Sequence, residues 1–350
     1  MERRRIAIIV SPWFPVPPSG YGGIELMAFN LARELSGRGH QVTIFGRQGS
    51  RGPFETLALA PESWTHQLGT LDQIPRENLF LYRAYETVRR RAFDIIHDNS
   101  GIGGILVAAQ ARLQAPVVAT LHGALRESEG DFLSAVARQV HLVAISRAQQ
   151  ATVAGVEWSG VVHNAIDPAE YSPITKPEEK ENYLVSLARI NPDKGQHVAI
   201  EVAKRLNVPL VLAGKVDVEG TRYFEEKIKP NLNEHVTWRE NVQGKEKAEL
   251  LAKAKALLFP IQWEEPFGLV MAEANACGTP VLAFPRGAAP EVIADGETGF
   301  LCADAAAMSE AVGRVEEIDP HACRARVEKM FSAQAMTSGY EDVYARVLAR

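Results

Sequence analysis

Short apolar runs and amphipathic stretches alternate along the first half of the chain. Over residues 24–35, apolar side chains recur every three or four positions, which predicts a helix that ends at Gly37. The intervening apolar runs are short and rich in β-branched residues, as buried strands are, and they lie at 6–10, 41–45, 94–97, 116–121 and 140–145. Strand and helix in repeated alternation predict a parallel sheet with right-handed crossovers.

The same pattern restarts after a charged, proline-containing stretch near the middle of the chain. We expect further strands at 183–187, 210–213, 236–238, 256–260 and 280–284. The sequence therefore predicts an α/β fold of two Rossmann-like, doubly wound parallel-sheet domains, each sheet buried on both faces. The expected divisions are an N-terminal domain at 1–170, a linker at 171–182, a C-terminal domain at 183–330 and a C-terminal helix at 331–350.

Composition supports two globular units. The 350 residues are 46% hydrophobic and 23% charged, which argues against a disordered chain. The formal net charge is −5, so bulk electrostatics give no support to nucleic-acid binding. Residues 1–170 hold 16 basic side chains, all arginine, and 16 acidic ones, and the first lysine is Lys176. The net negative charge therefore belongs to the second half.

Cysteine content and the N-terminus bear on the compartment. Three cysteines without a CxxC pair cannot build a disulfide framework, which indicates a reducing compartment. The apolar run at 6–10 is too short for the core of a signal peptide, and no stretch reaches the ~18 apolar residues of a membrane span. We therefore predict a cytoplasmic protein with no transmembrane segment. One arginine cluster fits either a solvated helix face or contact with an anionic acceptor or membrane surface: Arg83, Arg89, Arg90 and Arg91.

A glycine-rich loop, Gly20-Tyr21-Gly22-Gly23, stands directly before the first expected helix. Glycines let a ligand approach the backbone, and the helix N-terminus offers free N–H groups, which suits a phosphate. The loop is not a dinucleotide fingerprint, because Glu25 stands where GxGxxG needs its last glycine. A tight turn built for geometry alone remains the alternative.

Several polar residues end or follow expected strands, where ligands bind in open α/β sheets. His122 follows the strand at 116–121, and His97 and Asn99 lie at the end of the strand before it. A lone histidine is either structural or catalytic, and position alone leaves both readings of His122 open.

The second half holds more specific chemistry. Arg189 and Lys194 share one loop after a strand, and two cations there can clamp a diphosphate without a metal. Further along, Gly268 opens a helix between Glu265 and Glu273. A carboxylate on such a helix can hold the hydroxyls of a ribose, and the preceding carboxylate those of a second sugar.

The stretch from Glu265 to Glu273, continuing as Asn275-Ala276-Cys277-Gly278-Thr279-Pro280, resembles the E-x7-E motif of the retaining family 4 glycosyltransferases. Arg189, Lys194 and the Tyr21-Gly22-Gly23 loop match further motifs of that family. The resemblance implies the GT-B fold, in which two Rossmann-like domains face each other across a cleft and the C-terminal helix crosses back to the N-terminal domain.

The resemblance also implies roles by position. Arg189 and Lys194 would neutralise the donor diphosphate, Glu273 would hold the ribose, Glu265 the donor sugar, and His122 would face the transferred sugar. The other implied donor-binding residues are Gly22, Gly23, Gly214, Phe267, Gly268 and Leu269, and the acceptor candidates are Tyr21, Glu25, His97 and Asn99. Two departures leave the acceptor and the sugar open: Ile261 follows Pro260 where the family often has serine, and no second histidine follows His97.

The reaction expected from this resemblance moves a sugar from a UDP- or GDP-linked donor to a hydroxyl or similar nucleophile of a small-molecule, glycan or lipid acceptor. It would retain the anomeric configuration through a front-face attack. No DxD sequence occurs, so we expect neither a metal nor a cofactor. The alternatives are a nucleotide-sugar epimerase or hydrolase on the same fold and a non-catalytic nucleotide-sugar-binding module.

Overall fold

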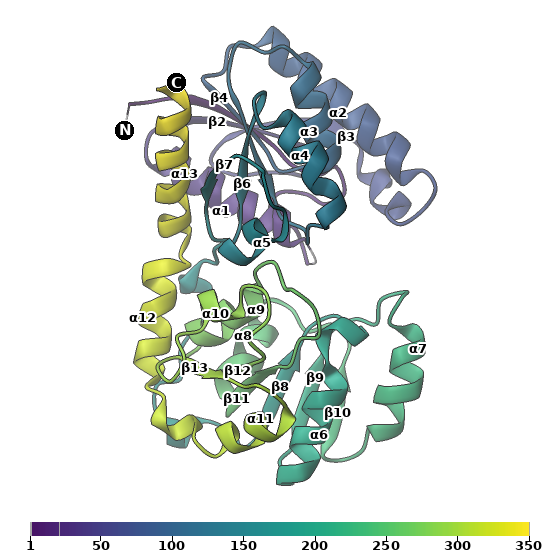
Figure 1. The fold of residues 1–350 in the computed structure, drawn as a ribbon, viewed down its shortest axis with the longest axis vertical. Coiled ribbons are helices and arrows are strands. Elements are labelled where there is room, and N and C mark those ends of the chain that lie inside the picture. The colour runs from purple at the N-terminus through teal and green to yellow at the C-terminus, as the bar shows by residue number, and fades with distance from the viewer. Residues whose placement is uncertain (1, 21, 350) are drawn as a thin grey trace. The chain divides into compact units, whose positions relative to one another are not determined.

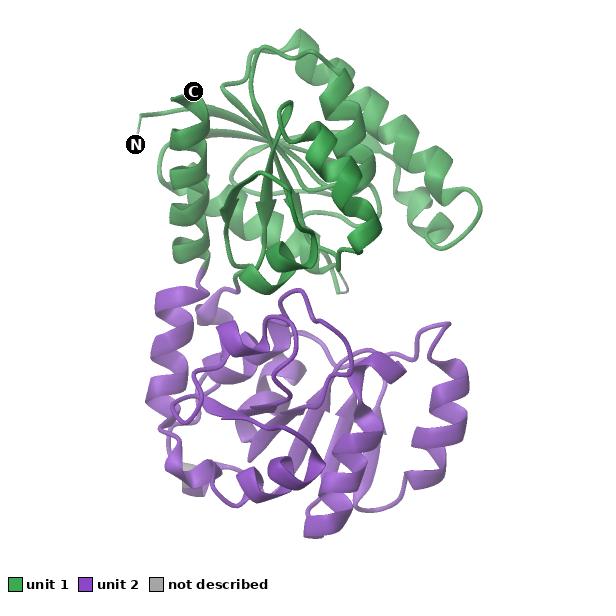
Figure 2. Cartoon of the chain, in the orientation of Figure 1, with its two compact units in different colours: residues 1–165, 333–350 green, residues 166–332 purple. Residues whose placement is uncertain are grey.

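The computed structural model describes residues 2–20 and 22–349, which divide into two compact units (Figures 1 and 2). Unit 1 combines Met1–Ala165 with Ala333–Arg350, and unit 2 is Ile166–Ser332. Each unit is a parallel sheet with helices on its faces, so the predicted fold class is confirmed. None of the helices in the described residues is long and apolar enough to cross a membrane.

The sheet of unit 1 contains seven parallel strands among the described residues, in the order β3-β2-β1-β4-β5-β6-β7. Alternate residues of β1 face opposite cores, with Ile6 and Ile8 in one and Ala7 and Ile9 in the other. The strand order reverses between β1 and β4, and ligands bind beyond the carboxyl ends of strands at such a point. The strands are β1 (Arg5–Ile9), β2 (Gln41–Arg47), β3 (Glu55–Ala60), β4 (Ile95–Asp98), β5 (Val117–Leu121), β6 (Val140–Ala144) and β7 (Trp158–Val161).

Helices cover both faces of this sheet. One face packs against α2 (Gln73–Arg90), α3 (Ile102–Gln110) and α4 (Gly130–Val136), and α5 (Arg147–Thr152) follows β6. The other face packs against α1 (Gly23–Gly37) and the C-terminal α13 (Ala333–Leu348). The arginine of an Arg38–Glu341 ion pair follows α1, and its glutamate lies on α13. The expected return of the C-terminal helix to the N-terminal domain is therefore confirmed.

The sheet of unit 2 has six parallel strands among the described residues, in the order β10-β9-β8-β11-β12-β13. Its order reverses between β8 and β11. The strands are β8 (Leu184–Leu187), β9 (Leu210–Ala213), β10 (Val236–Arg239), β11 (Ala256–Phe259), β12 (Val281–Ala283) and β13 (Gly299–Leu301). The helices are α6 (Gln196–Leu206), α7 (Thr221–Tyr223), α8 (Gly244–Lys253), α9 (Leu269–Ala276), α10 (Ala289–Val292), α11 (Ala305–Val312) and α12 (Pro320–Met330).

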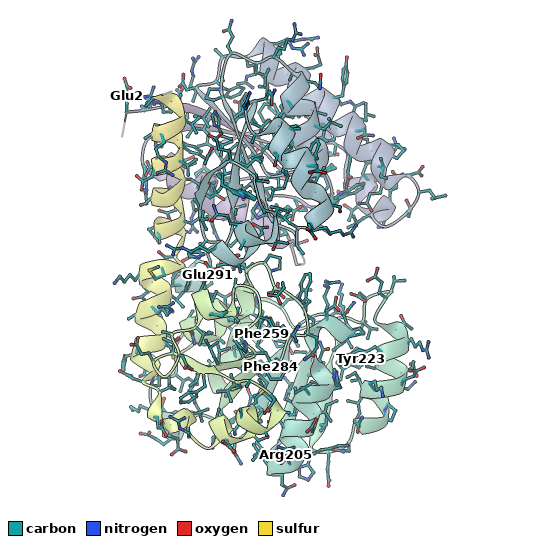
Figure 3. All side chains as sticks on the ribbon, in the orientation of Figure 1. Glu2, Arg205, Tyr223, Phe259, Phe284 and Glu291 are labelled. Carbon is teal, nitrogen blue, oxygen red and sulfur yellow. The ribbon has the colours of Figure 1, made fainter. Side chains whose placement is uncertain are left out.

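Three labelled aromatic residues mark the interior of unit 2 in Figure 3. Phe259 ends β11, and its carbonyl accepts the N–H of Phe284, which follows β12, at 3.2 Å. Tyr223 of α7 accepts the backbone N–H of His197 at 2.8 Å and so ties α7 to α6. These contacts fix the loops that leave the carboxyl ends of the strands.

The stretch 171–182, expected as a linker, belongs to unit 2 in the structure. Tyr171 is buried, and the Lys180 ammonium donates to the carbonyl of Ala252 and to the hydroxyl of Thr279, both at 2.8 Å. Prolines and charges make this stretch irregular, but its own contacts attach it to one unit. The unit boundaries lie at 165/166 and 332/333.

Candidate active site

Two loops at the strand-order reversal of unit 2 are locked together. Gly195 has φ 68°, and a Cβ there would lie 1.9 Å from the carbonyl oxygen of Pro260, so this approach requires glycine. The N–H of Gln262 donates to the carbonyl of Asp193 at 2.7 Å. Because one loop follows β8 and the other follows β11, their side chains gather at the place where α/β sheets bind ligands.

Arg189 and Lys194, the two expected diphosphate ligands, both lie in the loop after β8, and each is paired with a carboxylate. Arg189 Nη1 donates to Asp217 Oδ2 at 2.5 Å, and Lys194 Nζ donates to Glu265 Oε2 at 2.5 Å. The Lys194 and Glu265 side chains are only 11% and 12% exposed. The Trp263 indole N–H also donates to Glu265 Oε2, at 3.0 Å. Lys194 and Glu265, assigned to different parts of the donor, thus form one ion pair.

The loop after β12 fixes the backbone at Glu265. The N–H of Ala288 donates to the Glu265 carbonyl at 2.8 Å, and the N–H of Gly287 donates to the Glu264 carboxylate at 2.6 Å. Gly287 has φ 55°, and a Cβ there would lie 2.2 Å from the Glu265 oxygen. The Glu265 carboxylate is therefore presented from a rigid backbone.

Glu273 is buried on α9, eight residues after Glu265. Its Oε1 accepts a hydrogen bond from Lys247 Nζ at 2.7 Å, and that ammonium lies 5.9 Å from the centre of the Tyr171 ring. Burial, and secondarily the Glu273 charge, raise the pKa of Tyr171 well above its usual range. Tyr171 therefore stays protonated beside the carboxylate.

The remaining donor candidates of unit 2 shape the loops and the core around the site rather than presenting polar side chains. Gly268 has φ 79° and caps α9, whose first residue is the half-buried Leu269, so the helix N-terminus follows the Glu265 loop directly. Phe267 is buried, with its ring 5.7 Å from that of Phe331, and packs rather than faces solvent. Gly214 has φ 141°, and a Cβ there would lie 2.0 Å from the Ala188 oxygen.

In unit 1, the glycine loop before α1 is held by a buried carboxylate. Gly22 caps α1 with φ 145°, and a Cβ there would lie 2.8 Å from Pro18 Cβ and 3.0 Å from a Glu25 oxygen. Glu25 is 3% exposed, accepts the Ser11 hydroxyl, and has a pKa raised by burial. It therefore holds the loop that contains Gly22 and Gly23, which is a structural role that we did not predict. Tyr21 lies outside the described residues.

His122 is half-buried after β5. Its Nε2 lies 3.0 Å from Oδ1 of the buried Asn99, which requires the ring to donate from Nε2. Burial lowers the pKa of His122 to about 4, so the ring is neutral near pH 7. The side chain of Asn164 acts in the opposite direction and raises the pKa of His122, but burial outweighs it. His122 and Asn99, predicted for different substrates, thus form one pair.

His97 has a different place from the one predicted. It is fully buried, and its ring nitrogens lie 2.8 Å from the hydroxyls of Tyr344 and Thr120. Burial lowers its pKa to about 3. Its ring therefore connects β4 and β5 to α13, which is a structural role that we did not predict; the acceptor role stays a prediction. The end of a strand brings a residue to the ligand edge, but the last side chains of that strand still point into the core.

Known proteins resemble this chain over nearly its whole length. The family model described as "Glycosyltransferase Family 4" matches residues 21–170, and that described as "Glycosyl transferases group 1" matches residues 168–329. The chain belongs to glycosyltransferase family 4. It is therefore an enzyme of the glycosyltransferase class, as predicted.

Individual relatives of this family 4 glycosyltransferase are distant. A D-inositol 3-phosphate glycosyltransferase of Arthrobacter sp. (strain FB24) is 26% identical, in an alignment that covers 85% of this chain and 83% of the relative. The crystal structure of AviGT4, a glycosyltransferase involved in avilamycin A biosynthesis, superposes with a TM-score of 0.75 at 24% identity, covering 99% and 98% of the two chains. Anabaena Alr3699/HepE in complex with UDP and glucose superposes with a TM-score of 0.75 at 19% identity, covering 98% and 100%. These two structures show that the family 4 chain has their fold.

Proposed function

We propose that this glycosyltransferase takes a nucleoside-diphosphate sugar, with UDP or GDP as the nucleotide, and transfers the sugar with retention to a hydroxyl or similar nucleophile. The acceptor would be a small molecule, a glycan or a lipid. One observation carries the proposal: Arg189 and the Lys194–Glu265 pair lie in the two loops at the strand-order reversal of unit 2. The structure of Alr3699/HepE with UDP supports the same class of donor.

The charges of unit 2 fit the groups of such a donor. Arg189 and Lys194 offer two cations for the diphosphate, and Glu265 and Glu273 offer carboxylates for sugar and ribose hydroxyls. When a phosphate replaces Glu265 as the partner of Lys194, the carboxylate becomes free to accept a hydrogen bond from a hydroxyl. Binding would therefore exchange one ion pair for two ligand contacts, without leaving a buried charge unpaired.

The proposed transfer has a simple balance of bonds. The bond between the anomeric carbon and the diphosphate oxygen breaks, and the acceptor oxygen bonds to the same face of that carbon. The acceptor proton moves to an oxygen of the leaving phosphate. Arg189 and Lys194 stabilise the negative charge that develops there, and losing one such preorganised donor typically costs about 10²–10³ in rate. Neither a metal nor a cofactor is part of this proposal.

The test is to incubate the purified chain with UDP-, GDP- and ADP-linked sugars and to measure release of the nucleoside diphosphate. A panel of sugar, polyol and lipid acceptors then identifies transfer, and NMR of the product gives the anomeric configuration. We expect one nucleotide to be preferred, the configuration to be retained, and activity to persist in EDTA. An inverted product, or activity that EDTA abolishes, would refute the corresponding part of the proposal. Normal turnover in Arg189→Ala would refute the donor site itself.

A further inference from the structure

Asp217 is a charged residue of unit 2 to which neither the resemblance nor the proposed reaction gives a role. It lies in the loop after β9, and its carboxylate receives hydrogen bonds from three sources. Arg189 Nη1 donates to Oδ2 at 2.5 Å, Asn191 Nδ2 to the same oxygen at 3.1 Å, and the Gly220 N–H to Oδ1 at 2.6 Å. Its side chain is 20% exposed, whereas that of Arg189 is 47% exposed.

The loop that carries Asp217 is fixed against the loop that carries Arg189. The backbone of Ile190 forms a parallel bridge with Val216, and its N–H donates to the carbonyl of Lys215 at 2.8 Å. Gly220 passes so close that a Cβ there would lie 1.9 Å from the Ile190 oxygen. The backbone contacts between the two loops therefore place Asp217 where it can anchor a side chain of the neighbouring loop.

The arginine is held at both ends. The buried Gln196 donates to the carbonyl of Arg189 at 2.8 Å, which fixes the backbone, and Asp217 fixes the guanidinium. A guanidinium has five N–H donors in a planar fork, so those that do not face Asp217 remain for a phosphate. A half-exposed arginine without this anchor would sample several rotamers, of which only some point its free N–H groups at one phosphate oxygen.

We propose that Asp217 is a positioning residue that aims the Arg189 guanidinium at the departing diphosphate. This inference rests on the proposed donor site. Its energetic consequence has two parts of opposite sign. The carboxylate weakens the attraction of the site for a resting anion, but it prealigns the donor that stabilises charge during bond cleavage. Asp217 should therefore support turnover and not nucleotide affinity.

The experiment compares Asp217→Asn with Glu219→Gln, which removes one negative charge from an exposed position of the same loop. Turnover is measured as acceptor-independent cleavage of the sugar nucleotide that the wild-type chain cleaves fastest, and affinity by calorimetry with the nucleoside diphosphate released. For Asp217→Asn we expect kcat to fall about 10- to 100-fold, since misplacement by about 1 Å costs up to about 10². We expect the Kd of the nucleotide to stay equal or decrease, and Tm to match that of Glu219→Gln.

Two results would overturn the inference. One is a kcat for Asp217→Asn within threefold of that of Glu219→Gln. The other is a parallel loss of kcat, nucleotide affinity and Tm, which would mean that Asp217 only supports the fold of the loop.

A double variant tests whether Asp217 acts through Arg189. Adding Asp217→Asn to Arg189→Ala should lower kcat by less than twofold, because the group that Asp217 aims is already gone. A further loss as large as in the wild-type background would refute the route through Arg189. If Arg189→Ala is slow and Asp217→Asn is normal, only this inference fails. Normal turnover in Arg189→Ala instead refutes the proposed function.

Discussion

Replacing Lys194 by methionine should damage turnover and stability by separable amounts. Methionine keeps most of the length of the side chain but leaves Glu265 without its ion-pair partner at a site where both side chains are about one-tenth exposed. Breaking a buried pair from one side typically costs 3–5 kcal/mol. Because the Trp263 indole N–H still donates to Glu265, at 3.0 Å, we expect a cost at or just below the lower end of this range, about 2–3 kcal/mol.

For a unit of this size, 1 kcal/mol corresponds to about 2–4 °C in Tm, so Lys194→Met should lower the Tm of unit 2 by about 4–12 °C. Turnover of the sugar nucleotide should fall about 10²–10³-fold, because one of the two cations proposed to bind the diphosphate is lost. Calorimetric melting and acceptor-independent nucleotide release measure the two effects on the same preparation.

The double variant Lys194→Met/Glu265→Gln separates the two causes. It removes both charges, so it should recover most of the lost Tm and none of the lost turnover. Lys229→Met is the matched control, because its pair with Glu225 is 59% and 53% exposed and should contribute less than about 1 kcal/mol. A Tm for Lys194→Met equal to that of this control would refute the reasoning about burial. Normal turnover in Lys194→Met would refute the clamp.

Three further predictions follow from single side chains. His122→Ala should lower turnover far more than nucleotide affinity, whereas equal losses would mean a structural role. Glu273→Gln should remove the preference for UDP over 2′-deoxy-UDP in binding, and an unchanged preference would show that Glu273 does not hold the ribose. The pKa of His97, lowered to about 3, and that of His122, lowered to about 4, mean that the folded chain binds fewer protons than the unfolded chain between pH 6.5 and 4. The free energy of unfolding should therefore fall as pH decreases through that window, by up to about 1.4 kcal/mol per pH unit for each histidine. Denaturation of His97→Asn at several pH values should show a shallower dependence of this free energy on pH. An unchanged dependence would contradict the prediction.

The sequence pattern predicts the inner strands of both sheets and the edge strand β10, and it misses the other three edge strands. An inner strand such as β9 is buried on both faces and appears as a continuous apolar run. The missed strands β3, β7 and β13 each end a sheet order. β7 and β13 have only four and three residues and contain a glycine, and β3 and β7 are largely half-exposed. An edge strand pairs with only one neighbour and is less buried, so fewer of its residues need to be apolar.

The same limit applies to the site. Four candidate donor residues could be named from the sequence because each belongs to a local motif beside a strand end or a helix start: Arg189, Lys194, Glu265 and Glu273. Their ion-pair partners could not be named, because pairing is a property of the folded chain: Asp217 is 28 residues from Arg189. Asp217 lies four residues after Ala213, the last residue of β9, and an acidic residue just beyond a strand end was the one signal that could have identified it.

Local pairing explains how an acidic half of the chain can hold an anion. The candidate donor residues and their partners in the described part of unit 2 form three ion pairs whose summed charge is zero: Arg189 with Asp217, Lys194 with Glu265 and Lys247 with Glu273. An incoming diphosphate therefore meets a neutral cluster rather than the net negative charge of the second half. A carboxylate that loses its cation needs another hydrogen-bond donor, because leaving it unpaired costs free energy. Only a carboxylate that can accept a hydrogen bond from a ligand hydroxyl can therefore release its cation. Glu265 and Glu273 meet that condition in the proposed donor complex, whereas Asp217 has no hydroxyl to receive. This difference is why Asp217 should keep Arg189 through the reaction while Glu265 gives up Lys194.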